Sequence, residues 1–160
     1  MKYPLSTLVL AAASWLAVAP ALAQEKSNQE QAVALVKKAI DTIKKQGHEK
    51  AFAELNRLDS PFNTKSDINP HGDMYMLVYQ FDGVQPVHGK NPKIPGKNVL
   101  DMRDADGTYL IKDMLAACNS KAGNGWVSYK WPHSITKVIE AKQTYVEKTG
   151  EYCVGTGIYK

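Results

Sequence analysis

Apolar residues recur every three or four positions in the region that follows residue 24, and this spacing predicts an amphipathic helix. The positions that carry the pattern are Val33, Val36, Ala39, Ile40 and Ile43. Gly47 ends or bends this helix, and a second short helix is expected over residues 48–58. The run Asp59-Ser60-Pro61 stops the second helix, because a proline disfavours helical geometry in the residue before it.

The pattern changes to that of strands after residue 73. Residues 74–81 form a nearly continuous apolar run, which favours a central strand. Asp82-Gly83 is typical of a hairpin turn, so residues 84–88 are expected to return as a second strand. Pro86 must then stand where no backbone N–H is needed. Residues 89–107, which glycine and proline punctuate, predict a long ordered loop.

The last third of the chain predicts one helix and three strands. The helix covers residues 109–122 and ends at Gly123-Asn124-Gly125. The strands are expected at 126–131, 138–147 and 152–159, with a turn at Thr149-Gly150 between the last two. Strands that follow one another through short turns predict an antiparallel sheet. The fold class is therefore α+β, in a single domain that covers residues 24–160.

The first 23 residues have the order of regions found in a secretory signal peptide. Lys2 supplies the positive charge, residues 5–19 are almost wholly apolar, and Ala21-Leu22-Ala23 offers a cleavage site. An uncleaved membrane anchor is the alternative, but the apolar run is shorter than the roughly 20 residues that a spanning helix needs. We therefore expect cleavage after Ala23, no membrane span in the mature protein, and a periplasmic or secreted location.

Charge and cysteine content narrow the function classes. The net charge is +4, and the densest lysine group is interleaved with acidic residues, which favours a solvated helix face over a nucleic-acid partner. Cys118 and Cys153 are the two cysteines of the chain. In an oxidising compartment they form either a disulfide or two separate buried thiols, and both possibilities stay open.

The motifs of common catalytic and metal sites are missing from the sequence. No G-x-S-x-G, H-E-x-x-H, C-x-x-C or phosphate-binding glycine loop is present, and the four histidines are scattered. Asp101, Asp104 and Asp106 lack the spacing of an EF-hand. We therefore expect no enzyme activity, no metal and no cofactor.

Eight segments, in one order along the chain, resemble the second type of single Cache domain, the extracellular sensor module of bacterial signalling proteins. They are GHEKAFAELN (47–56), YMLVYQFDG (75–83), HGKNP (88–92), GKN (96–98), DADG (104–107), GNGWVSYKWP (123–132), KQTYV (142–146) and VGTGIY (154–159). Family members commonly show His-Pro where this chain has His88-Gly89, so we expect a looser pocket wall there.

The resemblance implies a PAS-like fold, in which a long N-terminal helix packs beside an antiparallel sheet of about five strands. It implies a ligand pocket between the sheet and the long loop, and binding of a small polar metabolite, often a short organic acid. Most members belong to chemoreceptors or kinases. Without a second membrane helix or signalling domain, this chain is expected to be a stand-alone secreted version that serves signal transduction or chemotaxis through a membrane receptor or transporter.

The strand pair expected at 126–131 and 138–147 concentrates side chains that suit a carboxylate ligand. Such a ligand needs charge-assisted hydrogen bonds or neutral donors beside apolar ring faces. The candidates in this pair are Lys142, Tyr129, Trp131, Tyr145 and Trp126. Lys142 is the candidate pocket cation, with a solvated lysine as the alternative. The aromatic residues are candidate walls or donors, with ordinary packing as the alternative.

Three further candidates lie outside this pair. Arg103, in the long loop, has the geometry for a two-pronged contact with a carboxylate, although a pair with Asp101 or Asp104 is slightly favoured. His88 either donates to a ligand or makes a structural hydrogen bond. Tyr75 faces either the pocket or the N-terminal helix.

Two other functions remain as alternatives to a ligand-binding sensor. One is an interaction module without a small ligand, which dimerises through the N-terminal helix. The other, less favoured, is a small extracellular enzyme. The sequence assigns no oligomeric state.

Overall fold

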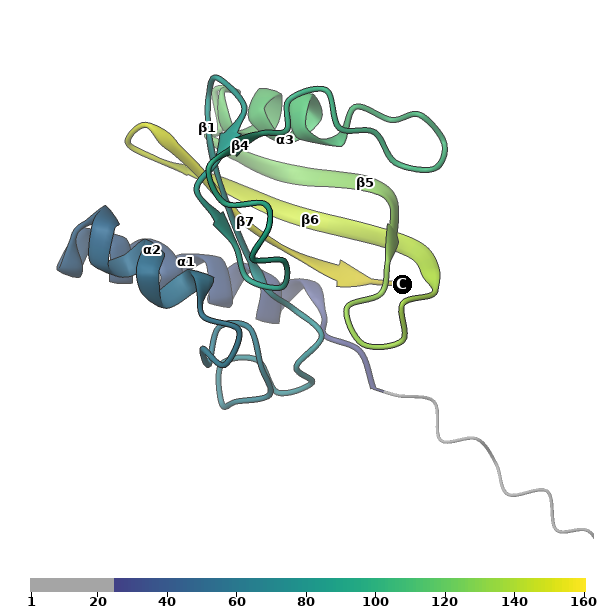
Figure 1. The fold of residues 1–160 in the computed structure, drawn as a ribbon, viewed down its shortest axis with the longest axis horizontal. Coiled ribbons are helices and arrows are strands. Elements are labelled where there is room, and N and C mark those ends of the chain that lie inside the picture. The colour runs from purple at the N-terminus through teal and green to yellow at the C-terminus, as the bar shows by residue number, and fades with distance from the viewer. Residues whose placement is uncertain (1–24) are drawn as a thin grey trace, which may run out of the picture.

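An antiparallel sheet of five strands divides the protein into two layers (Figure 1). The computed structural model describes residues 25–160, and the expected signal peptide lies outside this range. The strand order is β3-β1-β7-β6-β5. The strands are β1 (Met76–Gln80), β3 (Val87–His88), β5 (Asn124–Pro132), β6 (Ile139–Thr149) and β7 (Tyr152–Tyr159). The expected α+β fold with an antiparallel sheet is confirmed.

Two helices cover one face of the sheet (Figure 1). They are α1 (Gln29–Gln46) and α2 (His48–Asn56), and Gly47 turns the chain between them with a φ of 78° that favours glycine. Asn28 begins α1 with a capping box, since its side chain accepts from the N–H of Gln31 while the Gln31 side chain accepts from the N–H of Asn28. The apolar side of α1 packs against sheet residues such as Met76 and Val154.

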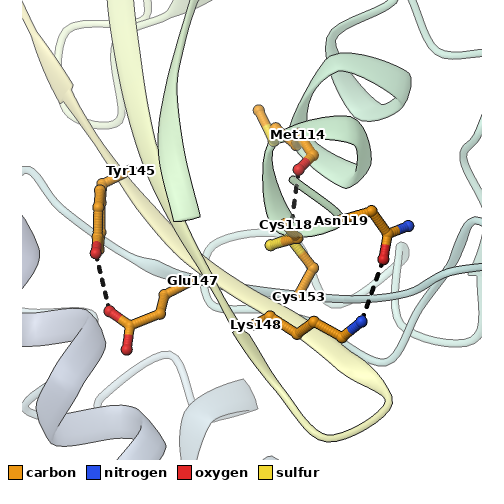
Figure 2. Close-up of a disulfide and its surroundings, with 7 residues drawn as sticks. All are labelled: Met114, Cys118, Asn119, Tyr145, Glu147, Lys148 and Cys153. Carbon is orange, nitrogen blue, oxygen red and sulfur yellow. Dashed lines mark hydrogen bonds between the residues drawn. A yellow bond between two sulfur atoms is a disulfide. The ribbon is translucent and has the colours of Figure 1, made fainter. Parts of the chain in front are cut away.

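The opposite face is covered by α3 (Leu110–Cys118) and by the long loop that precedes it. Ile111 and Met114 of α3 pack against Leu77 and Val146 of the sheet. A disulfide between Cys118 and Cys153 joins the end of α3 to β7, with the two Cα atoms 5.9 Å apart (Figure 2). This helix is therefore attached to the sheet by a covalent bond as well as by packing.

The return strand expected at 84–88 is divided at Pro86. Its first part, β2 (Val84–Gln85), pairs with β4 (Lys97–Asn98) of the long loop, and its second part is β3, which pairs with β1. Pro86 has no N–H for a ladder. Its carbonyl accepts from Asn56 Nδ2 at 2.8 Å, while Asn56 Oδ1 accepts from the His88 N–H at 3.0 Å. The end of α2 thus fixes the break between the two short strands.

Gly89 is closely packed, contrary to the loose wall expected at this position. Its N–H donates to the Met76 carbonyl at 2.9 Å, which a proline cannot do. A Cβ at this position would overlap the side chain of Asn63. Asn63 is fully buried and joins three segments: its Nδ2 donates to the carbonyls of Leu55 and Arg57, and its Oδ1 accepts from the Met76 N–H. His88 is therefore held in a fixed position.

Among residues 25–160, no helix combines the length and the apolar character needed to cross a membrane.

Candidate functional site

Lys142 is a lysine with only 1% of its surface exposed, on the face of the sheet that α3 covers. Its Nζ donates to Tyr75 Oη at 2.9 Å and to Tyr159 Oη at 3.3 Å, and it lies 4.1 Å and 4.7 Å from the centres of those rings. No ion pair within the described residues includes Lys142. A buried ammonium is costly unless it is paired, so hydroxyls and ring faces alone compensate it only in part.

A glycine makes room for this side chain. Lys142 lies directly opposite Tyr159 in the β6–β7 pair, and two residues further along the strands Gly157 lies opposite Thr144. A Cβ at position 157 would overlap the Lys142 side chain at Cε and would crowd Thr144 Oγ1. The stem of Lys142 therefore crosses the surface of β7 at a position where only a glycine fits.

Lys142 and the aromatic side chains around it form a cluster, and His88 and Tyr75 make up one side of it. Their rings are stacked, with centres 5.2 Å apart. His88 Nδ1 accepts from the backbone N–H groups of Lys90 and Asn91, at 3.3 Å and 3.0 Å, so the neutral ring carries its proton on Nε2. Burial first, and then the charge of Lys142, lowers the pKa of His88 to about 4. This histidine is a neutral hydrogen-bond donor at pH 7.

Tyrosine hydroxyls complete the cluster. Tyr129 Oη and Thr144 Oγ1 share a hydrogen bond of 2.7 Å, and Tyr159 Oη donates to the carbonyl of Pro132 at 2.9 Å. Burial raises the pKa of Tyr129 and of Tyr159 well above that of a free tyrosine. Both side chains therefore stay neutral, and the ammonium of Lys142 is not balanced by a tyrosinate.

A pocket of about 300 Å³ opens beside this cluster, between the end of β3 and the turn that joins β5 to β6. Its lining consists of Tyr75, His88, Lys90, Asn91, Trp131, Pro132, His133, Ser134 and Lys137. A second hollow of about 250 Å³ is lined by Tyr129 and Lys142, and also by two aspartates and two further lysines, Asp104, Asp106, Lys130 and Lys160. Lys142 does not line the first pocket but hydrogen-bonds to Tyr75, which does. The first pocket has lysines and no carboxylate in its lining, so it suits an anion better than the second does.

The described residues contain no cluster of histidine, cysteine, aspartate or glutamate with the make-up of a metal site. Their two cysteines are bonded to each other, so neither is a free thiol. The side chains around Lys142 instead provide hydrogen-bond donors beside aromatic rings, and this combination suits the binding of an anion.

Comparison with known proteins agrees with this geometry. The family model dCache_2, described as a Cache domain, matches residues 21–160. The chain belongs to the Cache domain family. The sensor histidine kinase MctS of Rhizobium johnstonii is 37% identical over 89 residues, which is 54% of this chain and 19% of that protein. The chain thus spans less than a fifth of the length of this curated relative.

Solved structures show the same fold. A methyl-accepting chemotaxis protein from Vibrio parahaemolyticus superimposes with a TM-score of 0.64 at 22% identity, over 81% of this chain and 86% of that one. A Cache chemosensory domain studied for carboxylic acid recognition gives a TM-score of 0.63 at 23% identity, over 81% of this chain and 91% of that one. The Cache fold expected from the sequence is therefore confirmed.

The Cache domain brings together five of the eight candidate residues. Tyr75 contacts both Lys142 and His88, and Tyr129 and Trp131 pack edge to face with ring centres 6.0 Å apart. Three of the five, Tyr75, His88 and Trp131, also line the pocket.

Two of the remaining candidates lie on the other face of the sheet. Trp126 and Tyr145 pack against each other on the side of α1, with ring centres 5.3 Å apart. Tyr145 Oη donates to Glu147 at 2.9 Å, which Figure 2 shows on the side of the sheet away from α3. Both belong to the core beneath α1, and we leave them out of the candidate site.

Arg103 is exposed and lies away from the cluster. Its guanidinium stacks 3.9 Å from the centre of the Tyr109 ring and donates to the hydroxyl of that residue. Asp101 pairs instead with Lys112, and Asp104 accepts from the backbone N–H groups of Thr108 and Lys130. Neither of the expected arginine–aspartate pairs forms, and Arg103 is also left out of the candidate site.

Four residues of the site were not singled out from the sequence: Tyr159, Lys90, His133 and Lys137. Tyr159 had a usable signal, because counting both strands back from the turn at Thr149-Gly150 brings it opposite Lys142. The other three lie in loops, where no alternation pattern assigns a direction to a side chain.

Proposed function

We propose that this Cache domain is a periplasmic or extracellular sensor that binds a small organic acid in the pocket beside Lys142 and serves signal transduction or chemotaxis. One observation carries the proposal: a buried ammonium with only hydroxyl and aromatic partners donates to Tyr75, which lines a pocket that has no carboxylate in its lining. A bound carboxylate would supply the missing counter-charge.

The donors around the pocket match the needs of a carboxylate. Lys142 has three N–H donors and uses two of them on tyrosine hydroxyls, which leaves one for a ligand. Tyr75 accepts from Lys142 and keeps its own proton to donate. Nε2 of His88 carries a proton, since Nδ1 is used as an acceptor. The ring of Trp131 gives the apolar carbon skeleton of a ligand a surface to pack on.

Size and relationship support the same ligand class. A pocket of about 300 Å³ is at the small end of ligand sites, which suits a metabolite of a few carbon atoms. The related MctS is a sensor histidine kinase, and one structural neighbour recognises a carboxylic acid. By analogy with these proteins, we assign the domain a role in sensing and no catalytic step.

Calorimetry and thermal shift with short carboxylic acids, amino acids and amines test the proposal. We expect carboxylic acids to raise the melting temperature by mass action and amines to leave it unchanged. Lys142→Met should weaken acid binding by at least about tenfold, because a carboxylate in a buried site loses its charged partner. Lys148→Met is the matched control, since Lys148 is an exposed lysine on the same strand.

Two results would count against the proposal. Unchanged affinity in Lys142→Met would remove this lysine from the site. No thermal shift with any acid, at concentrations up to the millimolar range, would instead favour the interaction module that dimerises through the N-terminal helix.

A further inference from the structure

The mouth of the pocket carries two more lysines, Lys90 and Lys137. Lys90 follows β3, and Lys137 lies in the turn between β5 and β6. No aspartate or glutamate lines this pocket. Four other pockets on the described part of the chain each include at least one carboxylate. The excess of positive charge is therefore particular to this pocket and does not merely reflect a lysine-rich surface.

Neither of these two ammonium groups takes part in an ion pair within residues 25–160. Lys137 Nζ donates to the carbonyl of Ser134 at 2.7 Å, which satisfies one of its donors but not its charge. Lys90 is half-buried, and its burial together with the charge of Lys137 lowers its pKa. Two like charges held this way cost free energy unless an anion lies between them.

The backbone of both lysines is fixed before any ligand binds. The Lys90 N–H donates to His88 Nδ1 at 3.3 Å. The Lys137 N–H donates to the His133 carbonyl at 3.0 Å, and Lys137 has a φ of 65°, a conformation that a non-glycine residue adopts only where its surroundings hold it. A site whose backbone is already ordered loses less entropy when a ligand binds than a flexible loop does.

We infer that the pocket takes an acid with two anionic groups. One carboxylate would bind to Lys142, Tyr75 and His88, and the second anionic group would lie between Lys90 and Lys137. This inference rests on the proposed function and refines the ligand class from an organic acid to a diacid of a few carbons. Tyr75 and His88 line the same small pocket as the two lysines of the mouth, so one short ligand reaches both groups.

Calorimetry with butanoate and butanedioate tests the inference, because these acids have the same number of carbons and differ by one carboxylate. We expect butanedioate to bind at least about fivefold more tightly at low ionic strength, and this advantage to shrink as salt is added. Lys90→Gln and Lys137→Gln should each reduce the advantage, because each should weaken the binding of butanedioate more than that of butanoate. Lys93→Gln is the control, since Lys93 is exposed in the same loop and does not line the pocket.

The possible outcomes separate the inference from the proposed function. If butanoate and other monocarboxylates bind as well as butanedioate, the diacid preference is wrong and the acid sensor stands. If the two glutamine variants keep the full advantage of butanedioate, the second anionic group does not lie at these lysines and the inference is overturned. If neither acid binds, both the proposed function and the inference fail.

Discussion

At the scale of single residues, neutral side chains surround the one charged side chain of the cluster, Lys142. The buried ammonium of Lys142 contacts the hydroxyls of Tyr75 and Tyr159, and the imidazole of His88 stacks on the ring of Tyr75. Burial keeps the histidine unprotonated and Tyr159 protonated. A second positive charge inside this cluster would repel the first, so protonation of His88 opposes both folding and the positioning of Lys142.

The neutral state of His88 predicts a dependence of stability on pH. Its pKa is about 4 in the folded protein, below the usual value near 6.5. Between these values the unfolded chain binds more protons than the folded protein does. The contribution of His88 to the free energy of unfolding is therefore complete above pH 6.5 and is lost as the pH falls to 4. Up to roughly 3 kcal/mol of unfolding free energy depends on this group. Burial lowers the pKa of His133 in the same direction.

Urea denaturation between pH 4 and 7.5 checks this prediction. His88→Asn keeps an acceptor for the N–H groups of Lys90 and Asn91 but does not titrate, so its stability should fall less steeply than that of the wild type. His48→Asn, at an exposed histidine, should keep the wild-type slope. A wild-type slope in His88→Asn would show that burial of this ring does not govern the acid sensitivity.

At the scale of secondary-structure elements, most of the fold could be predicted from periodicity. The three helices and the last three strands follow directly from the spacing of apolar residues. The break at Pro86 could not be predicted, because β2 and β3 are two residues long each and the side chain of Asn56, thirty positions earlier, fixes them. Pairings this short are decided by tertiary contacts, and a local pattern does not record those.

The disulfide is the second feature that sequence left open, because spacing along the chain does not give the distance between two cysteines. It joins α3 to β7 across a separation of 35 residues. Figure 2 also shows Lys148 reaching Asn119 at the end of α3, with Nζ 3.3 Å from Oδ1. The covalent bond and this contact hold one end of α3 against the hairpin of β6 and β7.

Removal of this bond should destabilise the protein. A cross-link that closes a loop of this length contributes about 4 kcal/mol, so the double variant Cys118→Ala/Cys153→Ala should lose about that much unfolding free energy in urea. Reductant should lower the stability of the wild type and leave the double variant unchanged. Labelling of both thiols in unreduced, unfolded protein would show instead that the bond does not form.

At the scale of the whole molecule, the sheet separates two hydrophobic cores that differ in what they contain. One side holds α1, α2 and the contact between Trp126 and Tyr145, and the other holds α3, the disulfide and Lys142 with its tyrosine partners. Lys142 and Tyr145 are three residues apart on one strand, so alternation places them on opposite faces, but it gives no means of deciding which face carries the pocket. The loop residues that line the pocket decide it, and their positions depend on the complete fold.

Hydrogen exchange with a saturating acid should report this division. We expect slower exchange of backbone amides at residues 88–91 and 131–137, which line the pocket, because a bound ligand holds both segments. The amides of α2, on the far side of the sheet, should exchange at unchanged rates. Protection confined to the two N-terminal helices would contradict the assignment of the pocket.

Gly157 limits how the sequence of the site can evolve. Because a methyl group there would take the space of the Lys142 stem, positions 142 and 157 cannot vary independently. A lineage that replaced the lysine by a shorter residue could gain a side chain on the neighbouring strand only if Thr144 also changed, because a Cβ at position 157 would crowd both residues. Covariation of positions 142, 144 and 157 would then separate the homologues that kept the lysine from those that lost it.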